Sequence, residues 1–220
     1  MLARGQVRSC SVQTPRQPHF INPCSHRVLP VPRALTSDSV AADIQAAEAS
    51  GDWLTAFERI TEARITQLQL SQESLEAGVR TLAKGGQWQR SVDMLTRLLD
   101  EGLAPTILQP TITTVFMALS QAQQGAQAES LLLVLSQSGV EPSLLGPAGN
   151  ISMRCGARAP GGAVLAYHKL ELLVTNAGKA DQLQVDLDTF SAVSYELMKQ
   201  GEEDKAEEVL EWRDFLSESD

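Results

Sequence analysis

The chain has 220 residues with 43% hydrophobic and only 5% aromatic content, so it can bury a core of mainly leucine, alanine and valine. No segment approaches the ~20 apolar residues that cross a membrane, and the longest strong apolar run is Leu131 to Leu135. Two of the three cysteines lie in the first 35 residues, and the single cysteine that remains excludes a disulfide framework for the rest of the chain.

The N-terminal segment 1–35 differs in composition from everything after it. It contains five arginines and five prolines but no lysine, aspartate or glutamate. An arginine-rich, acid-free segment without an apolar core is typical of an organellar transit peptide, and the prolines exclude a long helix. We therefore expect residues 1–35 to be a transit peptide, or else a plain disordered tail. The prolines and Arg8-Ser9-Cys10-Ser11 favour the chloroplast over the mitochondrion.

The charge balance reverses after this segment. Without the five arginines, 13 of the 18 basic residues remain against all 27 acidic ones, a balance of −14 for residues 36–220. A body of this charge repels phosphate at long range, which argues against nucleic acid as a partner.

Apolar residues at helical spacing predict five helical hairpins in chain order: 37–71, 72–106, 107–143, 144–186 and 187–220. The clearest is 72–106, where two helical patterns meet at Gly85-Gly86 and Gly102 closes the second. In the first hairpin, Ser37, Asp38 or Ser39 is expected to cap the leading helix. The fourth hairpin is the least regular, because Gly146, Pro147 and Gly149 weaken its helix start, and it could be a break in the array.

Short segments recur at a period near three dozen residues. Gly51-Asp52-Trp53 precedes Gly86-Gln87-Trp88 by 35 residues, and Gly102-Leu103-Ala104-Pro105 returns 37 residues later as Gly139-Val140-Glu141-Pro142. This period, with two helices in each unit, predicts an all-α fold: a right-handed α-solenoid of about five helix-turn-helix repeats over residues 36–220.

The unit 72–106 resembles a pentatricopeptide repeat. It has 35 residues, a first helix ending in Lys84, glycine at the turn, a small residue at Ser91 and the Gly102-Leu103-Ala104-Pro105 ending. Asp188-Thr189-Phe190-Ser191-Ala192 is similar to the opening of a repeat in this family. The tetratricopeptide signature fits less well, and the pentatricopeptide resemblance covers roughly residues 37–220.

The resemblance implies binding of single-stranded organellar RNA, in which each repeat reads one base with a side chain near the start of its first helix and another at its end. The corresponding pairs are Ala41 with Ser71, Glu76 with Thr106, Thr113 with Ser143, and Asn150 with Asp181, while Ser191 has no closing partner. Only Asn150 with Asp181 is a usual pair in the family, so we expect weak sequence selectivity. The alternative is that Asn150 caps a helix and Thr113 satisfies its own backbone.

Cations recur near the end of the first helix of several units. The candidates for contact with RNA phosphates are Arg80, Lys84, Arg154, Arg158 and Lys199. The two pairs with i,i+4 spacing each share one helix face, and in a solenoid of this kind the first helices line one side. The alternative is that these cations interact with the dipole at the helix C-terminus.

Nothing in the sequence indicates an enzyme, a cofactor, a metal site or a small-molecule substrate. His168 is the only histidine after the N-terminal segment, and a dyad with Cys155 is disfavoured because both fit as ordinary helix residues. Two functions remain. One is a pentatricopeptide-like protein that assists transcript processing, stability or translation in an organelle. The other is a tetratricopeptide-like scaffold that binds a protein partner.

Overall fold

The computed structural model describes residues 35–102, 107–177 and 185–217. The predicted transit peptide, residues 1–35, lies outside the described residues except for Leu35. Those residues contain α-helices and no β-strand. The helices are α1 (Ser37–Ser50), α2 (Trp53–Ile65), α3 (Gln72–Lys84), α4 (Trp88–Asp100), α5 (Gln109–Gln121), α6 (Gly125–Gln137), α7 (Pro142–Ala157), α8 (Gly162–Ala177), α9 (Leu187–Lys199) and α10 (Glu203–Ser217).

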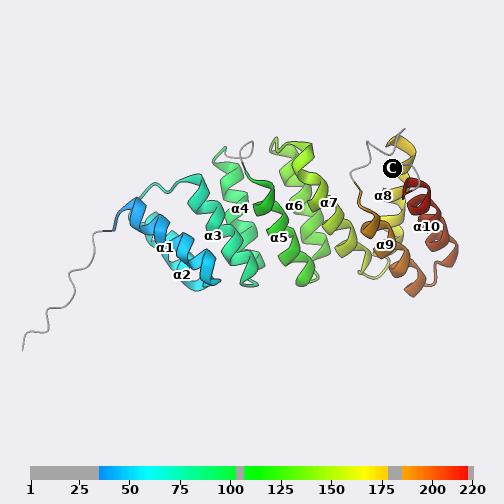
Figure 1. Cartoon of the computed structure of the whole chain (residues 1–220), viewed down its shortest axis with the longest axis horizontal. Helices are drawn as coiled ribbons and strands as arrows, with labels where there is room; N and C mark the ends of the chain where they lie inside the picture. The colour runs from blue at the N-terminus through cyan, green and yellow to red at the C-terminus, as the bar shows by residue number, and fades with distance from the viewer. Residues whose placement is uncertain (1–34, 103–106, 178–184, 218–220) are drawn as a thin grey trace, which may run out of the picture. The chain divides into compact units, whose positions relative to one another are not determined.

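The helices form successive pairs (Figure 1). We call the first helix of each pair helix A (α1, α3, α5, α7 and α9) and the second helix B (α2, α4, α6, α8 and α10). Each helix A packs against the helix B of its own pair and against the next helix A, and each of the first four B helices packs against the helix A that follows it. Packing limited to neighbouring units defines a helical repeat array. The all-α solenoid prediction is therefore confirmed.

Local sequence explains where the helices begin and end. The N-cap of α1 is Thr36, one residue before the predicted candidates, and its side chain forms a capping box with Ser39. Ser71 and Asp186 cap α3 and α9 in the same way, by accepting a hydrogen bond from a backbone N–H inside the first turn. Gly51 ends α1 at φ +72°, a conformation that favours glycine because it has no Cβ.

The buried core is made of three clusters along the array. The first joins α1, α2 and α3, the second extends from α3 into α7, and the third extends from α7 to α10. The second and third clusters meet within α7, where Ala148 belongs to one and Ala157 to the other. The core is therefore interrupted in the fourth unit, the one whose sequence is least regular.

The residues expected to weaken α7 do not stop it. This helix runs for 16 residues and contains Pro147 in its interior, whereas α3, α4, α5 and α6 have 13 residues each. A glycine in a helix costs about 1 kcal/mol and a proline about 3 kcal/mol. Packing outweighs these costs, since α7 contacts α5, α6, α8 and α9, and buries Ala148 and Ala157 completely. The fourth unit is thus helical, although its core is divided.

Candidate functional site

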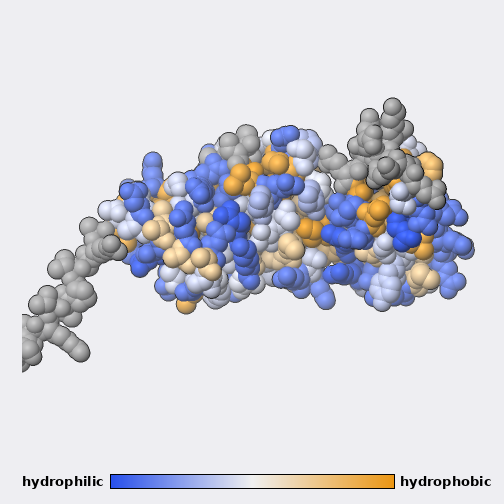
Figure 2. All heavy atoms as spheres, in the orientation of Figure 1, coloured by the Kyte–Doolittle hydropathy of each residue, from blue (hydrophilic) through white to orange (hydrophobic). Residues whose placement is uncertain are grey.

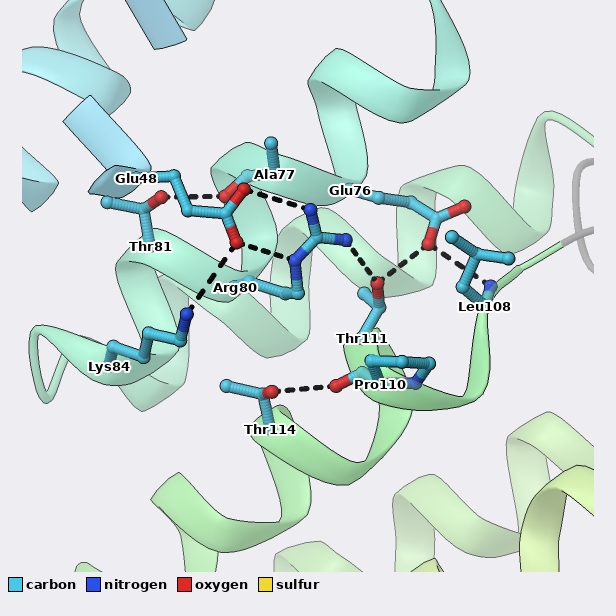
Figure 3. Close-up of polar contacts among 10 residues, drawn as sticks. All are labelled: Glu48, Glu76, Ala77, Arg80, Thr81, Lys84, Leu108, Pro110, Thr111 and Thr114. Atoms are coloured by element: carbon cyan, nitrogen blue, oxygen red, sulfur yellow. Dashed lines mark hydrogen bonds and ion pairs between the residues drawn. The ribbon is translucent and has the colours of Figure 1, made fainter. Parts of the chain in front are cut away.

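The A helices are joined by a polar network across the first three units (Figure 3). Arg80 in α3 donates from Nε to Glu48 Oε1 (2.7 Å) and from Nη2 to Glu48 Oε2 (2.9 Å) at the end of α1. Its third nitrogen, Nη1, donates to Thr111 Oγ1 (3.0 Å) in the first turn of α5. Lys84 Nζ lies 3.6 Å from Glu48 Oε1. One side chain of the middle repeat therefore holds both neighbouring repeats.

Glu76 completes this network from one turn earlier in α3. Its Oε2 accepts from Thr111 Oγ1 (2.6 Å) and from the backbone N–H of Leu108 (3.1 Å), while Oε1 accepts from Gln72 Nε2 (2.7 Å). The side chain is only 1% exposed. A buried carboxylate needs such partners, because removing it from water without them is costly. Glu76, assigned by the resemblance to base reading, here holds the start of α5.

Charge pairing determines the electrostatics of this region. The hydrogen bonds from Arg80 lower the pKa of Glu48 below its ordinary value of 4.5, although partial burial opposes the shift. Glu48 also raises the pKa of Arg80, so this guanidinium stays charged. Both side chains are mostly buried, at 17% and 21% exposed. Two of the cations predicted to contact RNA therefore face a carboxylate of this chain.

The remaining predicted cations lie on α7 and α9. Arg154 Nη1 lies 3.7 Å from Asp186 Oδ2, and Lys199 Nζ lies 2.9 Å from Glu196 Oε2, which raises the pKa of Lys199. Arg158 is the exposed C-cap of α7, and α7 packs against α9, which ends at Lys199. Lys84, Arg154 and Lys199 all lie in the last turns of their helices, which also agrees with the dipole explanation.

The residues assigned to base reading do not share one kind of position. Ser143 is exposed near the start of α7 and donates to Glu141 Oε1. Asn150 lies inside α7 and is 7% exposed, so it does not cap that helix. Ser191 accepts from Arg213 Nη1 and donates to the carbonyl of Leu187. Thr113 is half-buried on α5, whereas Asp181 lies outside the described residues.

Cys155 and His168 lie on different helices in different surroundings. Cys155 is buried in α7, and burial raises the pKa of its thiol above the ordinary value of 9.0 despite the opposing charge of Arg158. His168 is exposed on α8, with Nδ1 3.2 Å from Glu171 Oε2. Among the described residues, no three or more His, Cys, Asp or Glu side chains form a group that could hold a metal ion. None of the described helices is long and apolar enough to span a membrane.

The sequence reasoning missed an apolar surface on two B helices. Leu133 on α6 is 58% exposed, and on α8 Leu165, Leu172 and Leu173 are 63%, 62% and 43% exposed. On the face of the molecule shown in Figure 2, hydrophilic residues predominate and hydrophobic residues form separate patches between them. The signal was present in the run Leu131 to Leu135, because five consecutive apolar residues cannot all face one side of a helix.

Comparison of the chain with models of known protein families finds no match, and comparison with curated protein sequences finds none either. The fold therefore defines the class, a helical repeat protein, and the pentatricopeptide identity stays a prediction.

Proposed function

We propose that this chain is a helical-repeat scaffold that binds a protein partner. The observation that carries the proposal is the exposure of leucines on neighbouring B helices, Leu133 on α6 and Leu165, Leu172 and Leu173 on α8. Leu133 and Leu173 line the same open surface cavity, and neighbouring exposed apolar side chains mark interaction surfaces more often than isolated ones do. Helical repeat arrays bind partners over extended surfaces that span several repeats.

The electrostatics support a protein partner over a nucleic acid. Residues 36–220 carry a balance of −14, with 13 basic and 27 acidic residues. Arg80 and Lys84 face Glu48, and Lys199 faces Glu196. Non-specific RNA affinity depends on unpaired cations that release counterions from phosphates. Paired cations in an acidic body provide little of that free energy.

Affinity purification of the tagged full chain from cell extract, with and without RNase, tests the proposal. We expect a protein to co-purify at a fixed stoichiometry and to stay bound after RNase treatment and in 0.3 M salt. Loss of every partner on RNase treatment would contradict the scaffold function.

RNA binding is the second candidate function. It is favoured by Arg158 and Lys199, exposed cations at the ends of the neighbouring A helices α7 and α9, with Arg154 one turn before Arg158. This function predicts that the purified chain binds single-stranded RNA in a salt-sensitive way. It also predicts that the triple variant Arg154→Glu, Arg158→Glu, Lys199→Glu binds RNA at least tenfold more weakly. Equal RNA binding by the triple variant and the parent would exclude this surface.

The proposal includes import into an organelle, with the chloroplast favoured, on the composition of residues 1–35. Fusion of these residues to a fluorescent protein tests it. Plastid fluorescence is expected. Mitochondrial fluorescence would assign the protein to the mitochondrion instead, and diffuse cytosolic fluorescence would exclude import.

A further inference from the structure

An open groove runs between α6 and α8 over α7, with a volume of about 1170 Å³. We call it the α6–α8 groove. Leu133 of α6 and Leu173 of α8 stand on its walls, 58% and 43% exposed, and Leu145, Gly146 and Gly149 of α7 are part of its floor. Apolar lining therefore comes from three helices of two neighbouring repeats.

The floor of the groove is low because α7 presents glycines there. A Cβ atom added to Gly149 would meet no atom within 4 Å, so the space above it is open. By contrast, a Cβ added to Gly78 in α3 would lie 2.2 Å from Ile60 Cδ1. Glycine thus allows close packing in α3, whereas in α7 it leaves room for a side chain from another molecule.

The charges around the α6–α8 groove indicate the chemistry of its occupant. Lys169 of α8 pairs with Glu129 of α6 among the residues that line the groove, and this pair contributes no net charge. The helix α10, which packs beside α8, carries six acidic residues and two basic ones in its sequence EDKAEEVLEWRDFLS. None of the described residues that line the groove belongs to α10, but residues 36–220 together carry a balance of −14, so an occupant with an apolar side for the groove and basic residues beside it is complementary to the chain.

The secondary structure of the groove walls indicates which backbone conformation its occupant has. Both walls and the floor are α-helices, whose interior backbone groups are already hydrogen-bonded. An extended peptide would therefore find no sheet edge and would leave its own backbone groups without protein partners. A helix satisfies its backbone internally and can place leucine-like side chains at i, i+3, i+4 and i+7 into an apolar groove.

We infer that the α6–α8 groove binds an amphipathic helix of a partner protein, one with an apolar stripe and flanking basic residues. This inference rests on the proposed scaffold function and names the chemistry of the partner. The leucine stripe replaces water over Leu133 and Leu173, and the flanking basic residues complement the net negative charge of the chain.

A synthetic peptide tests the inference with the full chain. The probe is a fluorescein-labelled peptide of leucine and lysine, about 18 residues long to give a helix of about 27 Å, with its leucines on one helical face. Fluorescence anisotropy is measured in 0.15 M salt. Two control peptides have glutamate in place of lysine, or the same leucines and lysines in an order without a stripe. We expect both controls to bind at least tenfold more weakly than the probe.

Two independent groove variants follow. The double variant Leu133→Asp, Leu173→Asp makes both walls polar, and Gly149→Leu fills the floor without adding charge. Each is expected to weaken probe binding at least tenfold. Leu54→Asp is the matched control, since Leu54 is 48% exposed on α2 outside the groove, and it should bind the probe like the parent. Circular dichroism checks that all the variants keep the helix content of the parent. If the double variant fails to fold, Gly149→Leu still tests the groove.

Unchanged binding of the probe by both groove variants, or equal binding of the striped and stripeless peptides, would overturn the inference. The scaffold function itself would survive if the double variant still recovered the RNase-resistant complex from extract. If the extract yields no such complex while the peptide binds the groove, the scaffold function fails and the groove chemistry stands.

Discussion

The junction of α1, α3 and α5 and the junction of α6, α7 and α8 connect repeats in different ways. At the first, Arg80 and Glu76 link three A helices by hydrogen bonds, and glycine lets helices approach closely. At the second, the buried core is divided within α7 and an open groove remains above Gly149. The same helical hairpin can therefore serve either to lock repeats together or to leave a surface for a partner, depending on a few side chains.

The largest expected effect is at Glu76, the buried carboxylate of the first junction. Glu76→Ala leaves the Leu108 N–H and the Thr111 hydroxyl without their acceptor, and we expect a loss of about 3 kcal/mol in the free energy of unfolding. Urea denaturation at pH 7 measures it. Glu73→Ala, at an exposed position of the same helix, should cost less than about 1 kcal/mol. Equal losses for the two variants would show that Glu76 does not connect the repeats.

Matched arginine substitutions compare the network of the first junction with the Arg154–Asp186 pair, which joins α7 to the N-cap of α9. Arg80→Met keeps most of the side-chain packing but removes three hydrogen bonds, so we expect a loss of about 2 kcal/mol in the free energy of unfolding. Arg154→Met removes one ion pair, 3.7 Å long, to the half-exposed Asp186. We expect it to lower the free energy of unfolding by less than about 1 kcal/mol. Urea midpoints of both variants measure the difference, and a larger loss at Arg154 would reverse the comparison.

Alanine in place of glycine should have opposite effects at the two junctions. Gly149→Ala adds a methyl group in open space and lowers the backbone entropy of the unfolded chain, so we expect a gain of about 0.5–1 kcal/mol. Gly78→Ala places a Cβ 2.2 Å from the buried Ile60 side chain, so we expect a net loss of about 1 kcal/mol. Thermal melting followed by circular dichroism measures the sign, and shifts in the same direction would contradict this account of packing.

The last expected effect is the pH dependence of the Glu48–Arg80 pair. The pKa of Glu48 is lower in the folded chain than its ordinary value of 4.5, so the unfolded state binds protons more readily. The stabilisation is full above pH 4.5 and is lost as the pH falls through the lowered folded value. Glu48→Gln should therefore be about 1 kcal/mol less stable than the parent at pH 7, and this difference should shrink below pH 4.5. A difference that is constant with pH would exclude the ion pair as its source.

The sequence was sufficient for the helical hairpins but not for the contacts between them. In α3, Leu82 and Val79 recur at helical spacing and Gly85-Gly86 ends the pattern, so the helix and its turn follow from local rules. The pairing of Arg80 with Glu48 spans 32 residues and depends on how one repeat stacks on the next. No local pattern distinguishes Glu76, which is buried, from Glu73, which is exposed on the same helix.

The irregular fourth unit shows a different limit. Gly146, Pro147 and Gly149 lower helix propensity, but tertiary packing decides that α7 forms, because the helix packs against α5, α6, α8 and α9. The sequence anomaly was real, and its structural consequence is the α6–α8 groove rather than a lost helix.

The position of Arg80 between two neighbours has a practical consequence for cutting the protein into fragments. A fragment beginning near Ser71 would keep α3 but lose Glu48. The guanidinium of Arg80, mostly buried in the intact chain, would then face solvent and keep only Thr111 of the partners shown in Figure 3. Such a fragment would lose more free energy of unfolding than the contribution of the first repeat alone. It would also expose the positive charge of Arg80, which Glu48 neutralises in the intact chain. RNA affinity measured on that fragment would overstate what the whole protein can do.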